Sequence, residues 1–121
     1  MAKYVLRRVS SGIKFDLKAG NGETILTSEV YTTEAACRKG LAAVEKHAPL
    51  AAIEDQTVSD YAKCKNPKFE LYMDKASQYR FRLKASNGEI IGVSEGYAQK
   101  TSCQSGILSV RKNAEEAEIE T

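Results

Sequence analysis

Histidine and cysteine, which supply many catalytic and metal-binding groups, are scarce in this chain. The 121 residues include one histidine and three cysteines. A Ser-His-Asp site would have to be built around His47, and no Gly-x-Ser-x-Gly turn is present. No two cysteines have Cys-x-x-Cys spacing, and a closed zinc site needs four ligands. We therefore expect a protein that is not an enzyme, with no catalytic residues, no metal site and no cofactor.

Long apolar segments are absent as well. No run approaches the roughly 20 residues that a membrane-spanning helix needs, and the first residues, Met1 to Tyr4, lack the apolar segment of a signal peptide. An odd number of cysteines is typical of reduced thiols rather than of a disulfide framework. These absences predict a cytoplasmic protein that does not contact a membrane.

Excess charge of one sign is also missing. The net charge is +2, which is too small to imply a polyanionic partner by itself. A glycine-rich phosphate loop is absent, because Gly20-Asn21-Gly22 is too short and leads into a predicted strand instead of a helix.

What the chain does contain is an internal repeat. Residues 15–48 align without a gap to residues 81–114 at an offset of 66, and 16 of the 34 positions are identical. A repeat lets each unit be checked against the other. The identical residues in the first copy are Phe15, Leu17, Lys18, Ala19, Asn21, Gly22, Glu23, Ile25, Ser28, Glu29, Tyr31, Cys37, Gly40, Val44, Lys46 and Ala48.

Each repeat begins with three predicted strands. In the second strand of repeat one, Phe15 and Leu17 alternate with Asp16 and Lys18, which is the period of a half-buried strand. Asn-Gly at the following turn favours a type I′ hairpin in both copies. The expected strands cover residues 3–9, 13–19 and 23–28 in repeat one and 69–73, 79–85 and 89–94 in repeat two.

A helix and a short closing strand complete each repeat. The helices are expected from Thr33, a capping residue, to His47 and from Lys100 to Asn113, each with one apolar stripe. A glycine inside each helix, Gly40 or Gly106, suggests a close approach to the sheet or to the other helix. Closing strands are expected at 51–57 and 116–120. We divide the chain into repeat 1 (1–57), a linker (58–66) and repeat 2 (67–121), which fold as one pseudo-twofold domain.

The repeated motif resembles the YegP-like family of small, mostly bacterial proteins. The motif is Phe-x-Leu-Lys-Ala-x-Asn-Gly-Glu-x-Ile-x-x-Ser-Glu-x-Tyr in both copies, followed by a helix with glycine and valine on its stripe. Repeat two matches it more closely. Repeat one departs from it, with Arg7 where repeat two has Met73 and Asp16 in place of Arg82, so a basic outer face is weaker there.

The resemblance implies an α+β fold in which two tandem β-β-β-α-β repeats form one antiparallel sheet. Both helices would lie on one face, and the closing strands would be exchanged between the repeats. Members with a single repeat resemble homodimers of the same design, so this chain is expected to be a monomer that corresponds to a fused homodimer. The resemblance carries no known reaction, cofactor or catalytic residue.

Most isolated polar residues have a structural explanation. His47 lies at a helix C-terminus, where a cation is favoured. Cys37 and Cys103 fall on the buried helix stripes, whereas Cys64, in the linker, is the more exposed thiol. The repeated acids Glu23, Glu29, Glu89 and Glu95 are best explained as turn and helix-entry residues.

The candidate binding residues are Arg80, Arg82 and Lys84, with Tyr72 on the same sheet face. Basic residues with an aromatic on an open sheet can bind single-stranded nucleic acid by stacking a base. The alternative is a solvated strand face whose charges pair with neighbours such as Glu70 and Asp74.

Three functions follow. The first is a non-enzymatic binding or interaction module of unknown biochemical role, with protein partners as plausible as nucleic acid. The second is a weak nucleic-acid-binding protein that uses the basic sheet face. The third is an enzyme with a site at the repeat interface, which is disfavoured because no nucleophile with its base can be named.

Overall fold

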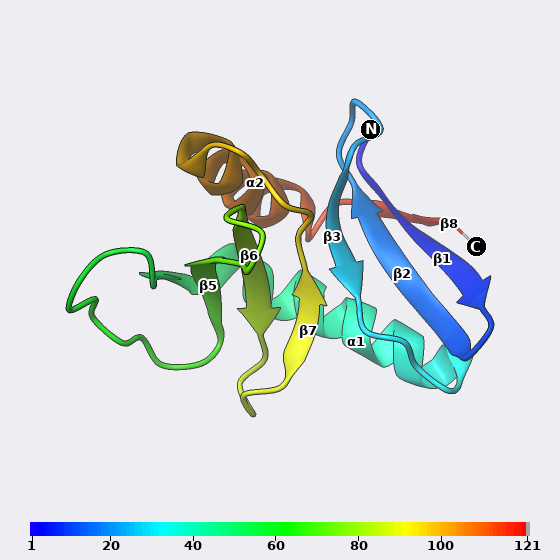
Figure 1. Cartoon of the computed structure of the whole chain (residues 1–121). Coiled ribbons are helices and arrows are strands. Elements are labelled where there is room, and N and C mark those ends of the chain that lie inside the picture. The colour runs from blue at the N-terminus through cyan, green and yellow to red at the C-terminus, as the bar shows by residue number, and fades with distance from the viewer. Residues whose placement is uncertain (121) are drawn as a thin grey trace.

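The computed structural model describes residues 1–120 and has the order β-β-β-α-β twice, with one additional short 3-10 helix in the first repeat (Figure 1). The first repeat contributes β1 (Lys3–Val9), β2 (Gly12–Lys18), β3 (Thr24–Ser28), α1 (Glu34–His47), the short 3-10 helix η1 (Ala48–Leu50) and β4 (Ala52–Asp55). The second contributes β5 (Lys68–Met73), β6 (Tyr79–Lys84), β7 (Ile90–Val93), α2 (Lys100–Asn113) and β8 (Glu118–Glu120).

All eight strands form one sheet, in the order β4-β5-β6-β7-β3-β2-β1-β8. The two repeats meet at the centre, where β7 lies beside β3 (Figure 1). The closing strands are exchanged: β4 of repeat one pairs with β5 of repeat two, and β8 pairs with β1. The expected α+β fold is confirmed, with one difference. The six inner strands are antiparallel, but both exchanged strands pair in parallel, so the sheet is mixed.

Both helices pack on the same face of the sheet. The inward residues Phe15, Leu17, Phe81 and Leu83 are fully buried, and they form one core with the apolar stripes of the helices. Each helix spans the repeat boundary, because α1 contacts β2 and β7 while α2 contacts β3, β5 and β6. The core therefore belongs to both repeats, and neither half keeps its apolar surface covered without the other. The helix residues buried in this core are Cys37, Leu41, Val44, Cys103, Gly106, Ile107 and Val110.

The two Asn-Gly hairpins are present, but they are not type I′ turns. A type I′ turn needs positive φ at both central residues. Here φ is positive only at the glycines, 86° at Gly22 and 85° at Gly88. In repeat one the Gly22 N–H donates to Ala19 O and the Ala19 N–H donates to Glu23 O, each over 2.9 Å, and the strand pairing shifts register between Leu17 and Lys18. This is the longer loop with a bulge at glycine, and repeat two has the same bonds.

The helices begin and end close to their expected positions. Thr33 caps α1, accepting a hydrogen bond from the Ala36 N–H at 3.1 Å. The close approach expected at the helix glycines is present at Gly106, where an added side chain would lie 3.0 Å from the Phe81 ring of β6, and at both glycines a tyrosine is nearer still. A side chain at Gly106 would lie 2.7 Å from the Tyr97 hydroxyl oxygen, and one at Gly40 would overlap the Tyr31 hydroxyl. Each glycine makes room for a tyrosine ring.

The first strands of the two repeats align at an offset of 65, not 66. Arg7 lies opposite Lys14, and Tyr72 lies opposite Arg80, which is the counterpart of Lys14. Arg7 is therefore equivalent to Tyr72, and its expected pairing with Met73 is wrong. The reason is that the equivalent cross-strand pairs Arg8–Ile13 and Met73–Tyr79 are separated by four and five residues, and a gap-free alignment does not reveal this difference.

Candidate interaction surface on the outer face

The outer face of the sheet, defined here as the face away from the helices, carries the four candidate binding residues. Arg80, Arg82 and Lys84 alternate along β6 with the buried Phe81 and Leu83. Tyr72 on β5 is the direct cross-strand neighbour of Arg80. The alternation of strand residues thus places all four on one surface.

The basic residues of this surface are paired with carboxylates. Arg80 Nε lies 2.5 Å from Asp74 Oδ2, and Arg82 Nε lies 2.6 Å from Glu70 Oε1. Lys84 Nζ is 3.5 Å from the other oxygen of Glu70. Burial of Glu70 disfavours its charge, but hydrogen bonds from Arg82 and Lys68 outweigh this and lower its pKa. The positive row is therefore largely compensated within the protein.

A second charged cluster lies beside it and is covered by the segment after β4. Lys68 Nζ is 2.8 Å from Glu54 Oε1 and 3.2 Å from Glu70 Oε2, and the Lys68 and Glu54 side chains are only 12% and 2% exposed. The backbone N–H of Cys64 and the amide of Gln56 also donate to Glu54. The outer face was expected to be open, but the linker covers it along β4 and β5.

These contacts determine the ionisation of Glu54. Burial alone would raise its pKa, but the hydrogen bonds from Lys68, Gln56 and Cys64 lower it to about 2. Glu54 is thus charged at neutral pH and attaches the linker to the sheet.

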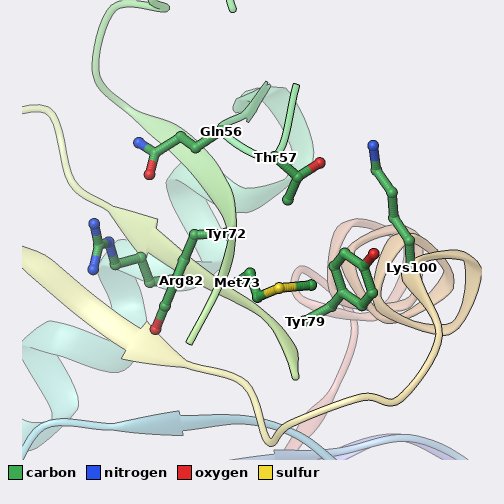
Figure 2. Close-up of a pocket in the computed structure, with 7 residues that line it drawn as sticks. All are labelled: Gln56, Thr57, Tyr72, Met73, Tyr79, Arg82 and Lys100. Atoms are coloured by element: carbon green, nitrogen blue, oxygen red, sulfur yellow. The ribbon is translucent and has the colours of Figure 1, made fainter. Parts of the chain in front are cut away.

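Next to this cluster is a hollow, which we call the Tyr72 hollow (Figure 2). The guanidinium of Arg82 lies 4.6 Å from the centre of the Tyr72 ring, a cation–π contact that Figure 2 shows from the side. The hollow encloses about 660 Å³. Its lining residues are Gln56, Thr57, Tyr72, Met73, Tyr79, Arg82 and Lys100.

Lys100 and Met73 complete the chemical character of the hollow. Lys100, at the start of α2, lies 2.6 Å from Asp55 Oδ2, so it also has a carboxylate partner. Met73 is about half exposed. The hollow therefore offers aromatic, thioether and amide surface beside one oriented guanidinium, with little uncompensated charge.

Repeat one has no aromatic residue at the equivalent place. Arg7 replaces Tyr72, and its Nε lies 2.6 Å from Asp16 Oδ2. Asp16 also accepts a hydrogen bond from Thr27. A feature present in only one of two related copies is not required by the shared fold, which makes the Tyr72 hollow the better candidate for a binding role.

Sequence reasoning missed five residues of the hollow. The predicted closing strand 51–57 includes Gln56 and Thr57, but the strand ends at Asp55 in the structure. Met73 and Tyr79 lie in predicted strands, and that prediction gives them no binding role. Lys100 was placed at a helix start without a partner. No local pattern points to them, because they come together only through the exchange of β4 into the second repeat.

The histidine and the three cysteines lie outside the Tyr72 hollow. His47 is the last residue of α1. Cys37 and Cys103 are buried, Cys64 is partly exposed, and none of the three is in a disulfide. Burial raises the pKa of Cys103 to about 11.

Within residues 1–120, the structure contains no cluster of three or more His, Cys, Asp or Glu side chains suited to a metal ion. Neither helix described here is long and apolar enough to cross a membrane.

Comparison with known proteins identifies relatives across nearly the whole chain. UPF0339 protein YegP of Escherichia coli O157:H7 is 40% identical over 103 residues, covering 85% of this chain and 80% of the relative. The Yersinia pestis protein of the same name is 38% identical over 114 residues, covering 93% and 88%. A UPF0339 protein of Treponema denticola is 60% identical over 52 residues, which make up 43% of this chain but 90% of that relative. The last relative is thus about the length of one repeat.

Solved structures agree with the fold. The solution NMR structure of yegP from E. coli, a protein of unknown function, has a TM-score of 0.80 at 34% identity and covers 98% of this chain and 90% of that chain. The UPF0339 protein from Shewanella oneidensis has the same TM-score at 32% identity, covering 98% and 89%. The resemblance to YegP-like proteins is confirmed. The family model for a domain of unknown function, DUF1508, matches residues 11–55 and again 74–120. This chain therefore belongs to the DUF1508 family and carries its domain twice.

Proposed function

We propose that this protein is a non-enzymatic binding module that contacts another protein through the Tyr72 hollow. The observation that carries the proposal is the stacking of Arg82 on Tyr72 at the rim of the hollow. Tyrosine, arginine and methionine are enriched at protein interfaces, where a few such residues supply most of the binding energy. We further propose that it acts in the cytoplasm, where its unpaired cysteines would stay reduced.

The orientation of Arg82 favours this function. Its Nε donates to Glu70 at 2.6 Å, while one side of its guanidinium rests on the Tyr72 ring. Both contacts reduce the number of conformations of a long side chain, so less entropy is lost when a partner binds. In the described part of the chain, only Nε of Arg82 takes part in a hydrogen bond, which leaves the terminal nitrogens for a partner.

A protein partner fits this surface better than nucleic acid does. Arg80, Arg82 and Lys84 each have a carboxylate within 3.5 Å, so phosphate contacts would compete with existing ion pairs. Arg82 also covers one face of the Tyr72 ring, which a stacked base would need.

The test compares Tyr72→Ala with Arg7→Ala, because these positions are equivalent in the two repeats. Tagged wild-type protein and both variants are used for affinity capture from the native cell, and captured proteins and nucleic acids are quantified. We expect one or a few proteins to be retained by the wild type and by Arg7→Ala and to be lost with Tyr72→Ala. Identical capture by all three would contradict the proposal.

A direct titration separates the nucleic-acid alternative. A fluorescent single strand is added at low salt to the wild type and to Arg82→Ala. Binding that weakens steeply with salt and is lost in the variant would favour nucleic acid over protein.

A further inference from the structure

Two grooves lie between the repeats, at equivalent positions and away from the Tyr72 hollow. Each is formed by the tyrosine and helix of one repeat and by the Asn-Gly hairpin of the other. The Tyr31 groove, of about 400 Å³, is lined by Tyr31, Ala36, Lys39, Gly40, Ala43, Ala85, Asn87, Glu89, Ile90 and Ile91. The Tyr97 groove, of about 480 Å³, is lined by Ala19, Asn21, Glu23, Ile25, Tyr97, Ser102, Ser105, Gly106 and Ser109.

All nine positions of the Tyr97 groove have their counterparts, 66 residues away, in the Tyr31 groove. Six of the nine pairs are identical, including the tyrosine, the helix glycine beneath it and the hairpin glutamate. The position of Glu89 relative to Tyr31 is therefore equivalent to the position of Glu23 relative to Tyr97. Burial raises the pKa of both tyrosines, and the carboxylate of the opposite repeat adds to this, which is consistent with the glutamate lying near the phenol.

The three pairs that differ all lie on the helix wall. Lys39 of the Tyr31 groove is replaced by Ser105 in the Tyr97 groove, and two alanines are replaced by Ser102 and Ser109. Only the Tyr31 groove thus has a cation on the helix side and an anion, Glu89, on the hairpin side. In residues 1–120, neither Lys39 nor Glu89 forms an ion pair. This contrasts with Arg80, Arg82 and Lys84 on the outer face, each of which has a carboxylate partner.

Most of the other lining residues of the Tyr31 groove are apolar. Ile91 is buried, and Ala43, Ala85 and Ile90 are partly buried. The Tyr31 hydroxyl adds a hydrogen-bonding group at the helix side. A concave site of a few hundred Å³, mainly apolar and with a few separated polar groups, is typical of small-molecule binding.

We propose that the Tyr31 groove binds a small zwitterion with an apolar body, of the chemical class of the aliphatic α-amino acids. Glu89 pairs with the ammonium group, Lys39 pairs with the carboxylate, and the aliphatic side chain lies against the alanines and isoleucines of the groove. The Tyr97 groove keeps the glutamate and the tyrosine but lacks the cation, so it binds the same molecule more weakly. This site is independent of the Tyr72 hollow.

The probes are L-leucine, L-isoleucine, L-valine and L-methionine, titrated into the full chain up to about 10 mM, enough to detect millimolar Kd values. Binding is followed by backbone amide chemical shifts, which also locate the site. We expect saturable shifts around Tyr31 for at least one probe. For that probe, the amide analogue without a carboxylate and the acid analogue without an ammonium should each bind about tenfold more weakly.

The repeat provides matched variants. Lys39→Ser gives the Tyr31 groove the residue of its twin and should weaken binding about tenfold, whereas Ser105→Lys should create a second site around Tyr97. Both positions are exposed on helices, so neither change should disturb the fold, and thermal unfolding checks this. Glu89→Gln should weaken binding as well. The absence of saturable shifts with all four probes, or binding unchanged by Lys39→Ser and Glu89→Gln, would overturn the proposal.

Discussion

The phenol of Tyr31 occupies the space that a side chain at Gly40 would fill. The absence of a side chain at Gly40 therefore allows the Tyr31 ring to pack against α1. The same arrangement recurs with Tyr97 and Gly106. Glycine inside a helix is unfavourable relative to alanine by about 1 kcal/mol. Both helices therefore have this unfavourable residue at the position against which a tyrosine packs.

Gly40→Ala should therefore have opposite effects in two backgrounds. In Tyr31→Ala protein the new methyl group meets no ring, so the free energy of unfolding should rise by about 0.5–1 kcal/mol. In wild-type protein it must displace Tyr31, and the gain should be cancelled or reversed. Urea unfolding of the four proteins measures the coupling. Additive effects within about 0.3 kcal/mol would show that Tyr31 and Gly40 do not interact.

Glu54→Gln should reduce stability at neutral pH by about 2 kcal/mol, because it removes one of the two carboxylate partners of the largely buried Lys68. The folded pKa of Glu54 is about 2, below the unfolded value near 4.3. Its contribution is therefore present above the unfolded pKa and is lost as the pH falls from about 5 to about 2. Glu54→Gln should flatten this part of the stability profile.

The control is Glu120→Gln, since Glu120 is the counterpart of Glu54 in repeat two. Glu120 lies 3.2 Å from Lys3, but both side chains are about half exposed, and such pairs contribute little. Equal losses in the two variants, or parallel pH profiles, would contradict the role of the buried cluster.

A fragment of residues 1–57 should not form a folded monomer. Its closing strand β4 pairs only with β5, which lies in the other repeat, and its strand β1 loses β8. The fragment should unfold or associate into a dimer that restores both pairings. Size-exclusion chromatography with light scattering gives the oligomeric state, and circular dichroism shows whether the fragment is folded. A folded monomer would show that the exchanged strands are not needed for stability.

Under native conditions the thiol of Cys64 should react fastest with an aromatic disulfide reagent. Cys37 and Cys103 are fully buried, and burial raises the pKa of both thiols, so little thiolate is available at pH 8. We expect one fast equivalent in buffer and three in denaturant, with Cys64→Ser removing the fast one. Rapid reaction of all three native thiols would mean that the helices open readily.

Local features of the fold could be predicted from the sequence because they depend on neighbouring residues. The alternation of Phe15 and Leu17 with Asp16, the Asn-Gly turns and the stripe around Val44 each determine an element and its buried side. The direction of strand pairing is different. Parallel and antiparallel neighbours have the same alternation of side chains, so the residues of β4 do not reveal that β5 runs parallel to it.

The sites could be predicted only in part. The outer-face row of Arg80, Arg82 and Lys84 follows from a single strand, and Glu70 and Asp74 were within reach as partners. The grooves were not expected, because each joins a helix to a distant hairpin, about 50 residues away in the Tyr31 groove and about 85 residues away in the Tyr97 groove. Glu23 and Glu89 were visible as identical positions, but their turn locations gave a sufficient local explanation.

The covalent connection between the repeats has an evolutionary consequence. In a homodimer of single repeats, every substitution is made twice, so both symmetry-related positions change together. In this chain Lys39 differs from its equivalent Ser105, and Tyr72 differs from Arg7, whereas Glu89 and Glu23 are identical. Covalent linkage therefore allows one copy to carry a side chain that the other lacks, while both keep the residues of the shared fold.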